Sequence, residues 1–364
     1  MPEGRVNGND KDGRDPRLVQ LLNAVRGRRK PLIQTHNNPD PDALGSAVGM
    51  QALYKRYLNA EARIVFGGIV GRAENRAMLR LLRIEIVPAH KVDYDSCDLL
   101  TLVDAQPGMG HAPLPEGRVP EVVIDHHPPR QKPAGTLYWD VGRPLGATCT
   151  IVALLFLRNR IPLDTKVATA LLYGIKSDTH DLGEGATPDD VEAFRELLVH
   201  ADNSTLSRIE NARVPPPYFA VFRRAIANAL VYDFACVSHL GKIDNPDMVA
   251  EMADFLLRCE DLRWTMVTGI YNKTLHLSVR SSDPNAHAGG VARLAVGVMG
   301  AAGGHGRMSG GQIPLGKADK KTRLQVVSAV TDSFLDAVKA KRTLSHALVA
   351  GTLPDETDTS VEFP

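Results

Sequence analysis

Short β-branched runs and longer amphipathic stretches alternate along the chain from residue 31 onward. The predicted strands are residues 31–35, 62–66, 99–103 and 121–124, and the predicted helices are residues 43–58, 73–82, 147–158 and 164–175. Parallel strands need crossover connections, which are usually helical. The pattern therefore predicts an α/β fold with a doubly wound, mostly parallel sheet.

The pattern changes after residue 187. Residues 188–224 read as helical, and Pro215, Pro216 and Pro217 interrupt them, as suits a linker or hinge. The later segments predict strands at residues 234–240, 265–271 and 274–280 and helices near residues 248–257 and 288–298, followed by a glycine-rich run. We expect a smaller C-terminal α/β domain, with a cleft between the two domains.

The length of 364 residues favours two domains, because single cores stop growing below that size. The expected parts are a disordered tail over residues 1–16, a first domain over 17–187, a helical linker over 188–228, a second domain over 229–342 and a C-terminal tail over 343–364. Within these tails, disorder is expected most clearly for residues 1–15 and 354–364.

Charge and cysteine usage narrow the classes of partner. Lysine plus arginine number 43 against 42 acids, so no surface suited to wrapping long nucleic acid is indicated. The four cysteines are widely spaced without a Cys-x-x-Cys pair, as in reduced cytosolic proteins. No apolar run reaches membrane-spanning length, and the N-terminus lacks a signal-peptide core. We expect a cytoplasmic protein without a membrane partner.

Acids and histidines follow several of these elements. His36, Asp40 and Asp42 come after the first strand, and Asp125, His126 and His127 come after the run Val122-Val123-Ile124. Asp104 ends the strand of residues 99–103, and Asp178 follows the helix of residues 164–175. A doubly wound sheet gathers such positions at its carboxyl edge. Four acids and two imidazoles favour two divalent cations, Mn²⁺ first with Mg²⁺ and Co²⁺ as alternatives, over a thiolate-bound zinc, although imidazole leaves zinc and iron open.

Each of these residues also has a structural interpretation. Asp104 or Asp178 alone could be a helix cap or a turn residue. Asp40 and Asp42 flank Pro41 and could form an Asx turn, and His36 could be a hydrogen-bonded loop histidine. Their joint occurrence at one sheet edge, in this order, favours metal binding.

The ordered motifs Thr35-His36-x-x-Pro39-Asp40-x-Asp42-Ala43-x-Gly45-Ser46, Val103-Asp104, Asp125-His126-His127 and Gly174-Ile175-x-Ser177-Asp178-Thr179 resemble the DHH phosphoesterase superfamily. The segment from Gly303 to Gly311 resembles the glycine-histidine signature of the first type of DHH-associated domain. The resemblance covers about residues 31–340 and is nearest to nano-RNases, oligoribonucleases and 3′-phosphoadenosine 5′-phosphate phosphatase-like proteins.

The resemblance implies a role for each residue of the first domain. His36, Asp40 and Asp104 would hold one metal; Asp42, Asp104, His126 and Asp178 would hold the other, with Asp104 as the bridge. Asp125 would orient a histidine. His127 would donate to the phosphate or the leaving oxygen, or have a purely structural role.

The second domain would hold the part of the substrate that does not react. Residues implied in substrate binding are Arg280, Gly303, Gly304, His305, Arg307 and Ser309. Glycine amides can approach a phosphate closely, and the cationic side chains add charge-assisted bonds. Without the resemblance, a glycine run is more often a flexible loop.

Three positions depart from the family pattern. Pro41 and His180 stand where glycine is frequent, and Ala302 replaces the first of three glycines. None of these removes a ligand, but they leave the substrate preference open. His180 could contact a base or face solvent, and we favour solvent.

The leading prediction is a metal-dependent phosphodiesterase that cuts short RNA or linear dinucleotides such as pApA and pGpG into 5′-mononucleotides. An enzyme acting on cyclic dinucleotides or on 3′-phosphoadenosine 5′-phosphate is the alternative. A type II inorganic pyrophosphatase shares the first domain, but the glycine-histidine segment argues against it. A non-catalytic nucleotide-binding module is disfavoured because the ligand set is complete. A homodimer is also possible.

Overall fold

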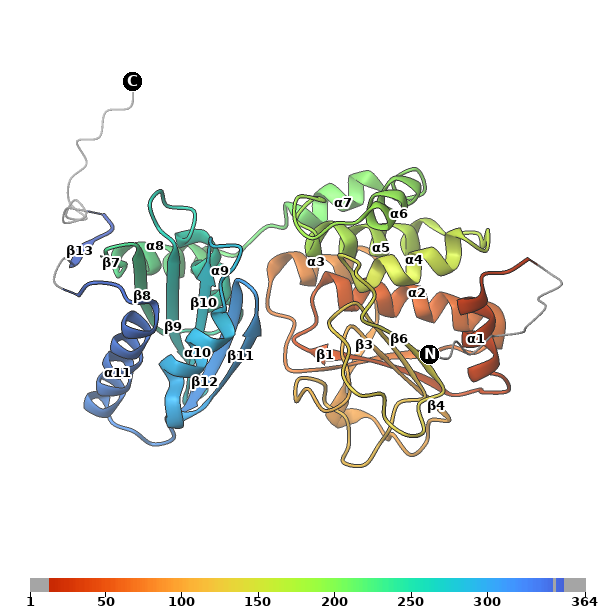
Figure 1. Cartoon of the computed structure of the whole chain (residues 1–364), viewed down its shortest axis with the longest axis horizontal. Helices are drawn as coiled ribbons and strands as arrows, with labels where there is room; N and C mark the ends of the chain where they lie inside the picture. The colour runs from red at the N-terminus through yellow and green to blue at the C-terminus, as the bar shows by residue number, and fades with distance from the viewer. Residues whose placement is uncertain (1–12, 343–344, 350–364) are drawn as a thin grey trace, which may run out of the picture. The chain divides into compact units, whose positions relative to one another are not determined.

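The computed structural model describes residues 13–342 and 345–349, which divide into two compact units between Arg213 and Val214. The predicted tail residues 1–12 and 350–364 lie outside the described part. Residue 15 already caps a helix, α1 (Pro16–Ala24). Figure 1 shows the elements of both units.

The first unit is built on a six-stranded sheet of order β3-β2-β1-β4-β5-β6, and every neighbouring pair is parallel. Its strands are β1 (Pro31–Asn37), β2 (Arg63–Gly67), β3 (Ile86–Pro88), β4 (Leu99–Val103), β5 (Val122–Asp125) and β6 (Tyr138–Val141). Its helices are α2 (Pro41–Leu58), α3 (Ala73–Leu81), α4 (Thr148–Leu157), α5 (Thr165–Asp178), α6 (Pro188–Leu198) and α7 (Asn203–Glu210), with a 3₁₀ turn, η1 (Ala89–Lys91).

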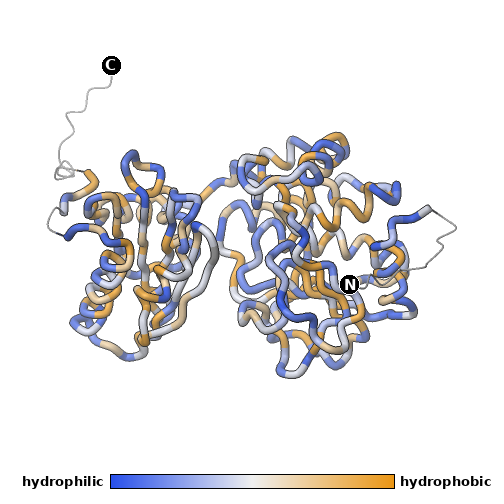
Figure 2. The backbone as a smooth tube through the Cα atoms, in the orientation of Figure 1, coloured by the Kyte–Doolittle hydropathy of each residue, from blue (hydrophilic) through white to orange (hydrophobic). Residues whose placement is uncertain are grey.

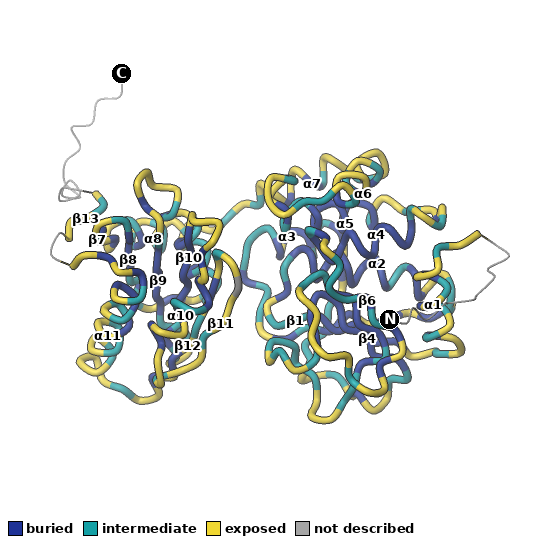
Figure 3. The backbone as a smooth tube through the Cα atoms, viewed as in Figure 1, coloured by how far each residue is buried: buried dark blue, intermediate teal, exposed yellow. Residues whose placement is uncertain are grey.

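Successive side chains along each strand point to opposite faces of this sheet. On β1, Ile33 joins the large core beneath the helices, whereas its neighbour Leu32 joins a smaller cluster with Tyr94 and Leu100. The central strands β1, β4 and β5 and the helices α4 and α5 are accordingly mostly apolar and buried (Figures 2 and 3). Burial on both sides explains why the central strands read as continuous hydrophobic runs.

The second unit contains a seven-stranded mixed sheet of order β11-β12-β10-β9-β8-β7-β13, in which only the β8–β9 pair is parallel among the described strands. Its strands are β7 (Leu230–Tyr232), β8 (Ala235–Lys242), β9 (Trp264–Tyr271), β10 (Thr274–Ser281), β11 (Ala301–His305), β12 (Met308–Pro314) and β13 (Ser345–Ala347). Its helices are α8 (Pro216–Ala227), α9 (Asp247–Leu256), α10 (Ala288–Val296) and α11 (Lys320–Val338), with the 3₁₀ turn η2 (Gly297–Met299).

Helices cover both faces of this second sheet. On β9, Met266 packs in the cluster that includes α10 and α11, and the next residue, Val267, packs in the cluster that includes α8 and α9. The fold class predicted from the sequence, a mostly parallel α/β sheet with a smaller α/β unit, is confirmed.

Residues 188–228 form α6, α7 and α8. Helices α6 and α7 belong to the first unit and α8 to the second. The prolines that suggested a hinge begin α8, where Pro215 is the N-cap residue and Pro216 and Pro217 occupy the first helical positions. Proline is favoured there because its fixed φ suits the helix and no amide hydrogen is needed.

Candidate metal centre

The first acid-histidine cluster connects β1 to α2. His36 lies near the end of β1, and Asp40 is the N-cap of α2, where its side chain accepts a hydrogen bond from the amide of Ala43 at 3.0 Å. Asp42 lies in the first turn of this helix and is fully buried. Asp40 is therefore a helix cap, whereas the structural alternative predicted for it was an Asx turn, and this role leaves its second oxygen for another contact.

The remaining predicted ligands come from three other element ends. Asp104 follows β4 directly with φ of 54°, a left-handed conformation that is uncommon outside glycine and occurs at functional sites. His126 and His127 follow β5, whose last residue is Asp125. Asp178 is the last residue of α5.

The structure brings all six predicted metal-ligating residues together. His36 Nε2 lies 3.6 Å from Asp40 Oδ2 and 3.4 Å from Asp104 Oδ2. His126 Nε2 lies 3.4 Å from Asp178 Oδ2 and 3.9 Å from Asp104 Oδ1. Three donor groups have ligand atoms within 4.8 Å of one another: His36, Asp40 and Asp104; Asp42, His126 and Asp178; and Asp104, His126 and His127. Asp104 and His126 each belong to two of these groups, and the two oxygens of Asp104 face His36 and His126 separately, as those of a bridging ligand would.

Hydrogen bonds to the backbone orient both ligand histidines. The Nδ1 atoms of His36 and His126 lie 2.9 Å from the carbonyl of Asn37 and 3.0 Å from that of Leu145. A carbonyl can only accept, so Nδ1 carries a proton in both rings, and Nε2 of the neutral imidazole would present its lone pair to a cation. His126 Nε2 is buried and has no hydrogen-bond partner among the described residues. Such an orphaned acceptor amid carboxylates fits a bound cation.

Crowding of carboxylates perturbs the ionisation of the cluster. Burial, reinforced by the charge of Asp104, raises the pKa of Asp42 to about 7. Burial and the charges of Asp42 and Asp40 raise the pKa of Asp178 well above its usual value. For His36, burial lowers the pKa but the carboxylates of Asp40 and Asp104 outweigh it, so its pKa is raised. Negative charge is therefore concentrated beyond what two imidazoles neutralise, which also fits divalent cations.

The carboxylate of Asp42 rests on the N-terminus of α4. Its two oxygens each accept a 2.7 Å hydrogen bond, from the amides of Thr148 and Cys149. The Thr148 hydroxyl also donates to Asp104 Oδ1 at 2.9 Å. Glycine allows this approach, because a Cβ at Gly174 would lie 2.3 Å from Cys149 Sγ. The sequence prediction missed Thr148, although its place at the start of a predicted helix is a signal for anion binding.

Asp125 and His127 form a second layer beside the ligands. His127 Nδ1 lies 2.8 Å from Asp125 Oδ1, and the other Asp125 oxygen accepts a 2.7 Å hydrogen bond from Gln106 Nε2. Burial lowers the pKa of His127, but its bond to Asp125 and the charge of Asp104 outweigh this and raise the pKa to about 9. His127 is thus a protonated donor in the metal-free chain. Sequence reasoning missed Gln106, which carries no motif.

Arg280, predicted to contact phosphate, is largely engaged within the second unit. It is 8% exposed, its Nε donates to Asp254, and its Nη1 donates to Ser278 Oγ and to the carbonyl of Ser309. Its Nη2 makes no hydrogen bond within the described part of the chain. Ser309 is also buried, and its hydroxyl donates to the carbonyl of Ala288 at 2.9 Å. Both residues therefore have structural partners besides any substrate.

The glycine-rich run forms a β-hairpin, β11 and β12, joined at Gly306 and Arg307. Gly304 is required by packing, because a Cβ there would lie 2.5 Å from Ser309 Cα, and a Cβ on Gly289 of α10 would lie 2.1 Å from the Gly304 carbonyl oxygen. A Cβ at Gly303 would meet nothing within 4 Å, so this residue has room for a ligand. The side chain of His305 lies outside the described part. The Arg307 carbonyl accepts from the Ser281 amide at 3.0 Å.

Two further predictions concern the surface. His180 is exposed, and its Nδ1 lies 3.7 Å from Glu184 Oε2. Among the described residues, no helix is both long and apolar enough to cross a membrane.

Comparison with known proteins links these features to one family. Residues 30–175 match the DHH family, N-terminal domain. An uncharacterized protein of Methanocaldococcus jannaschii is 31% identical over 332 residues, which cover 89% of this chain and 68% of that protein. A probable manganese-dependent inorganic pyrophosphatase of Lactobacillus acidophilus is 31% identical over 171 residues, 46% of this chain. That match spans 54%, about half, of the pyrophosphatase.

A solved structure extends the likeness to both units. The exopolyphosphatase-related protein of Bacteroides fragilis has a TM-score of 0.68 over 88% of this chain and 97% of that protein, at 15% sequence identity. At this identity the likeness concerns the fold.

Proposed function

The chain belongs to the DHH family of phosphoesterases, and we propose that it is a metal-dependent phosphodiesterase that hydrolyses short oligonucleotides or linear dinucleotides such as pApA and pGpG to 5′-mononucleotides. The observation that carries the proposal is a pair of neighbouring donor groups, one of His36, Asp40 and Asp104 and the other of Asp42, His126 and Asp178. Asp104 reaches both, because its Oδ2 lies 3.4 Å from His36 Nε2 and its Oδ1 lies 3.9 Å from His126 Nε2, a buried atom without a hydrogen-bond partner among the described residues. Such a pair of groups is what two adjacent divalent cations require.

We assign His36, Asp40 and Asp104 to one cation and Asp42, Asp104, His126 and Asp178 to the other. Mn²⁺ is the proposed metal, with Mg²⁺ and Co²⁺ as alternatives, because oxygen donors predominate and the Lactobacillus acidophilus relative is described as manganese-dependent. When bound, the cations would polarise the phosphate and lower the pKa of a water between them towards neutrality.

The chain's own residues supply orientation and a proton. Asp125 fixes the ring of His127 by accepting from Nδ1–H, and Gln106 fixes Asp125. We propose that the His127 imidazolium donates to the phosphate or to the leaving oxygen. The N-terminus of α4 holds Asp42 in place through two amides, so this ligand is preorganised before any cation arrives.

The preference for short substrates rests on the second unit. We propose that the Gly303 backbone, His305, Arg307 and the Nη2 of Arg280 bind the terminal phosphate or the base, with Gly304 and Ser309 shaping the hairpin. The formal charge of +1 also suits a substrate held locally better than a long polyanion.

A second candidate is inorganic pyrophosphate. The observation in its favour is the 31% identity to the Lactobacillus acidophilus pyrophosphatase over 171 residues. The match spans only about half of that relative, so this activity is the weaker proposal.

A substrate panel with Mn²⁺ separates the candidates. It contains pApA, pGpG, a five-nucleotide RNA, cyclic dinucleotides, 3′-phosphoadenosine 5′-phosphate and pyrophosphate, and kcat/KM is compared across them. We expect the highest values for the linear dinucleotides or the short RNA. If kcat/KM is highest for pyrophosphate, the second proposal replaces the first. If it is highest for a cyclic dinucleotide or for 3′-phosphoadenosine 5′-phosphate, that compound is the substrate instead.

A further inference from the structure

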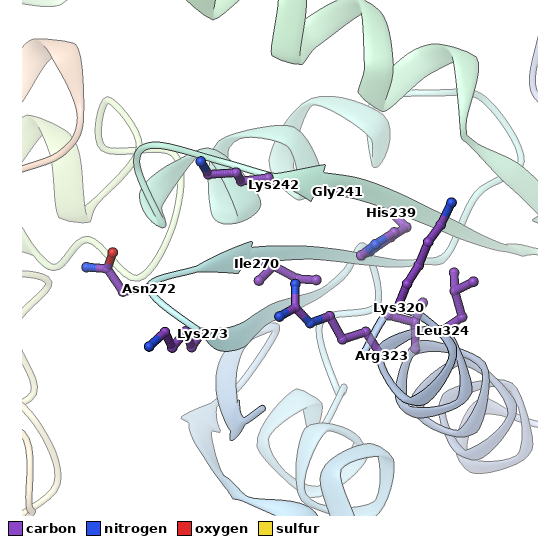
Figure 4. A pocket seen from close by; sticks show the side chains of 10 residues that line it. His239, Gly241, Lys242, Ile270, Asn272, Lys273, Lys320, Arg323 and Leu324 are labelled. Carbon is purple, nitrogen blue, oxygen red and sulfur yellow. The ribbon is translucent and has the colours of Figure 1, made fainter. Parts of the chain in front are cut away.

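A cavity of about 760 Å³ lies in the second unit between α11 and the ends of β8, β9 and β10. Its lining residues are His239, Gly241, Lys242, Ile270, Asn272, Lys273, Lys320, Arg323, Leu324 and Val327 (Figure 4). The volume falls within the range of small-molecule sites. None of these residues belongs to the candidate metal centre or to the glycine hairpin.

The charged residues that line the cavity are all cationic. Lys242, Lys273, Lys320 and Arg323 all line it, and no acidic residue does. Within the described part of the chain, none of these four cations forms a salt bridge. Like charges gathered around one cavity repel each other, and a bound anion would relieve that repulsion. Figure 4 shows the Arg323 guanidinium extending from α11 across the sheet towards Ile270.

An irregularity in the sheet forms the rim of the cavity. The register between β8 and β9 shifts between His239 and Lys242, and Gly241, inside the shift, has φ of 67°. A Cβ on Gly241 would meet nothing within 4 Å, so the space above it is open. Bulges of this kind redirect side chains, and here the bulge precedes Lys242 at the rim.

The remaining lining is apolar. Ile270 belongs to the sheet, and Leu324 and Val327 line the cavity from the N-terminal half of α11. Leu324 is 55% exposed, although the C-terminal half of the same helix buries Val330 and Phe334 fully. An apolar wall beside a cluster of cations suits a ligand with a ring at one end and phosphate at the other.

This cavity is separate from the predicted phosphate contact at Arg280. Asn272 and Lys273 precede β10, whereas Arg280 lies near its other end. At about 3.4 Å per residue, the two ends of this eight-residue strand are roughly 24 Å apart. A ligand in the cavity would therefore leave the Arg280 region unoccupied.

We propose that this cavity is a binding site for a nucleoside phosphate, with the phosphates held by Lys242, Lys273, Lys320 and Arg323 and the base packed on Ile270, Leu324 and Val327. The site does not depend on the proposed hydrolysis. It gives the second unit a means of sensing a small phosphorylated molecule in addition to holding a substrate.

Isothermal titration calorimetry of the full chain in EDTA, with ADP, adenosine and inorganic phosphate as probes, tests the proposal. The background is Asp104→Ala, so that the metal centre contributes no binding. We expect saturable binding of ADP that weakens as salt rises from 50 to 200 mM, with adenosine and phosphate each binding at least about tenfold more weakly.

Single variants then locate the site. Lys273→Glu and Arg323→Glu should each weaken ADP binding at least about tenfold, and Leu324→Asp, at an exposed position, should weaken it without a change in melting temperature. The matched control Lys341→Glu, an exposed lysine of the same unit outside the cavity, should bind as the parent does. Absence of saturable binding, phosphate binding as tight as that of ADP, unaltered binding by Lys273→Glu and Arg323→Glu, or equal loss in the control would overturn the proposal.

Discussion

Replacing Gln106 with leucine should impair turnover by releasing Asp125 and, through it, His127. Gln106 is 1% exposed and makes three hydrogen bonds: to Asp125 Oδ2 at 2.7 Å, to the Pro128 carbonyl at 3.1 Å and from the Arg130 amide at 2.7 Å. Leucine has a similar volume but can make none of them.

The expected cost in stability follows from these partners. Asp125 is fully buried, and a hydrogen bond to a charged group contributes about 1.5–3 kcal/mol. The unsatisfied Arg130 amide adds about 1 kcal/mol. A loss of about 3 kcal/mol lowers the melting temperature of a domain of this size by roughly 6–12 °C. Because outer partners of metal ligands typically affect activity about 10–100-fold, we expect kcat to fall by about that factor.

The assay measures kcat and KM at a temperature where the variant is folded, together with urea unfolding. Gln51→Leu is the matched control: its side chain donates to the Ala62 carbonyl at 2.6 Å, away from the cluster. It should lose about 1 kcal/mol of stability and retain kcat. A folded Gln106→Leu variant with the kcat of the parent would refute the positioning of His127 through Asp125 and Gln106.

Three other outcomes are expected. Because the pKa of Asp42 is raised to about 7, its carboxyl group is protonated in the metal-free folded chain between about pH 4 and 7, where that of the unfolded chain is ionised. The free energy of unfolding therefore falls as pH rises through that window. Mn²⁺ must displace the proton, so its effect on the melting temperature should be larger at pH 8 than at pH 6, and the reverse order would contradict the assignment. Gly289→Ala should destabilise the second unit by about 2–3 kcal/mol, because its Cβ would lie 2.1 Å from a backbone oxygen. The control Gly290→Ala should be neutral or stabilising by up to about 1 kcal/mol, and urea unfolding measures both variants. Arg280→Ala should lower the unfolding free energy of the second unit by about 2–4 kcal/mol as well as raise KM, and unchanged stability would show that its buried hydrogen bonds contribute little.

The first sheet could be predicted from the sequence because its strands are buried on both faces. Strands β1, β4 and β5 lie within about one residue of the predicted ranges at their starts, and α2 begins two residues earlier, at Pro41. The short edge strands β3 and β6 were missed, since three or four residues carry too little pattern.

The second unit was harder to predict. The strands β11 and β12 are rich in glycine, which strands generally avoid, and the run therefore suggested a clamp loop. The structure gives a packing reason for the glycine at residue 304, which contacts α10 through Gly289. The helix α11 was also missed, because its N-terminal half mixes exposed charged residues with apolar ones and its buried residues all lie in the other half.

The candidate site could likewise be predicted only in part from the sequence. The residues in motifs could be chosen from sequence because acids and histidines at strand ends share one sheet edge. Gln106 could not, because its importance arises from a hydrogen bond to Asp125, 19 residues away. The start of a predicted helix marks Thr148 as an anion-binding position, but its partner Asp42 lies 106 residues away and could not be identified from the sequence.

The most direct test of the two-cation centre is the anomalous difference map of crystals grown with Mn²⁺. We expect two peaks about 3.5–4 Å apart, with Asp104 between them, one within coordination distance of His36 and Asp40 and the other of Asp42, His126 and Asp178. The peak beside Asp42, His126 and Asp178 should weaken or disappear in Asp104→Ala crystals, and the same variant should not hydrolyse the preferred substrate. A map without manganese between these residues, or an Asp104→Ala variant with full turnover, would contradict the account.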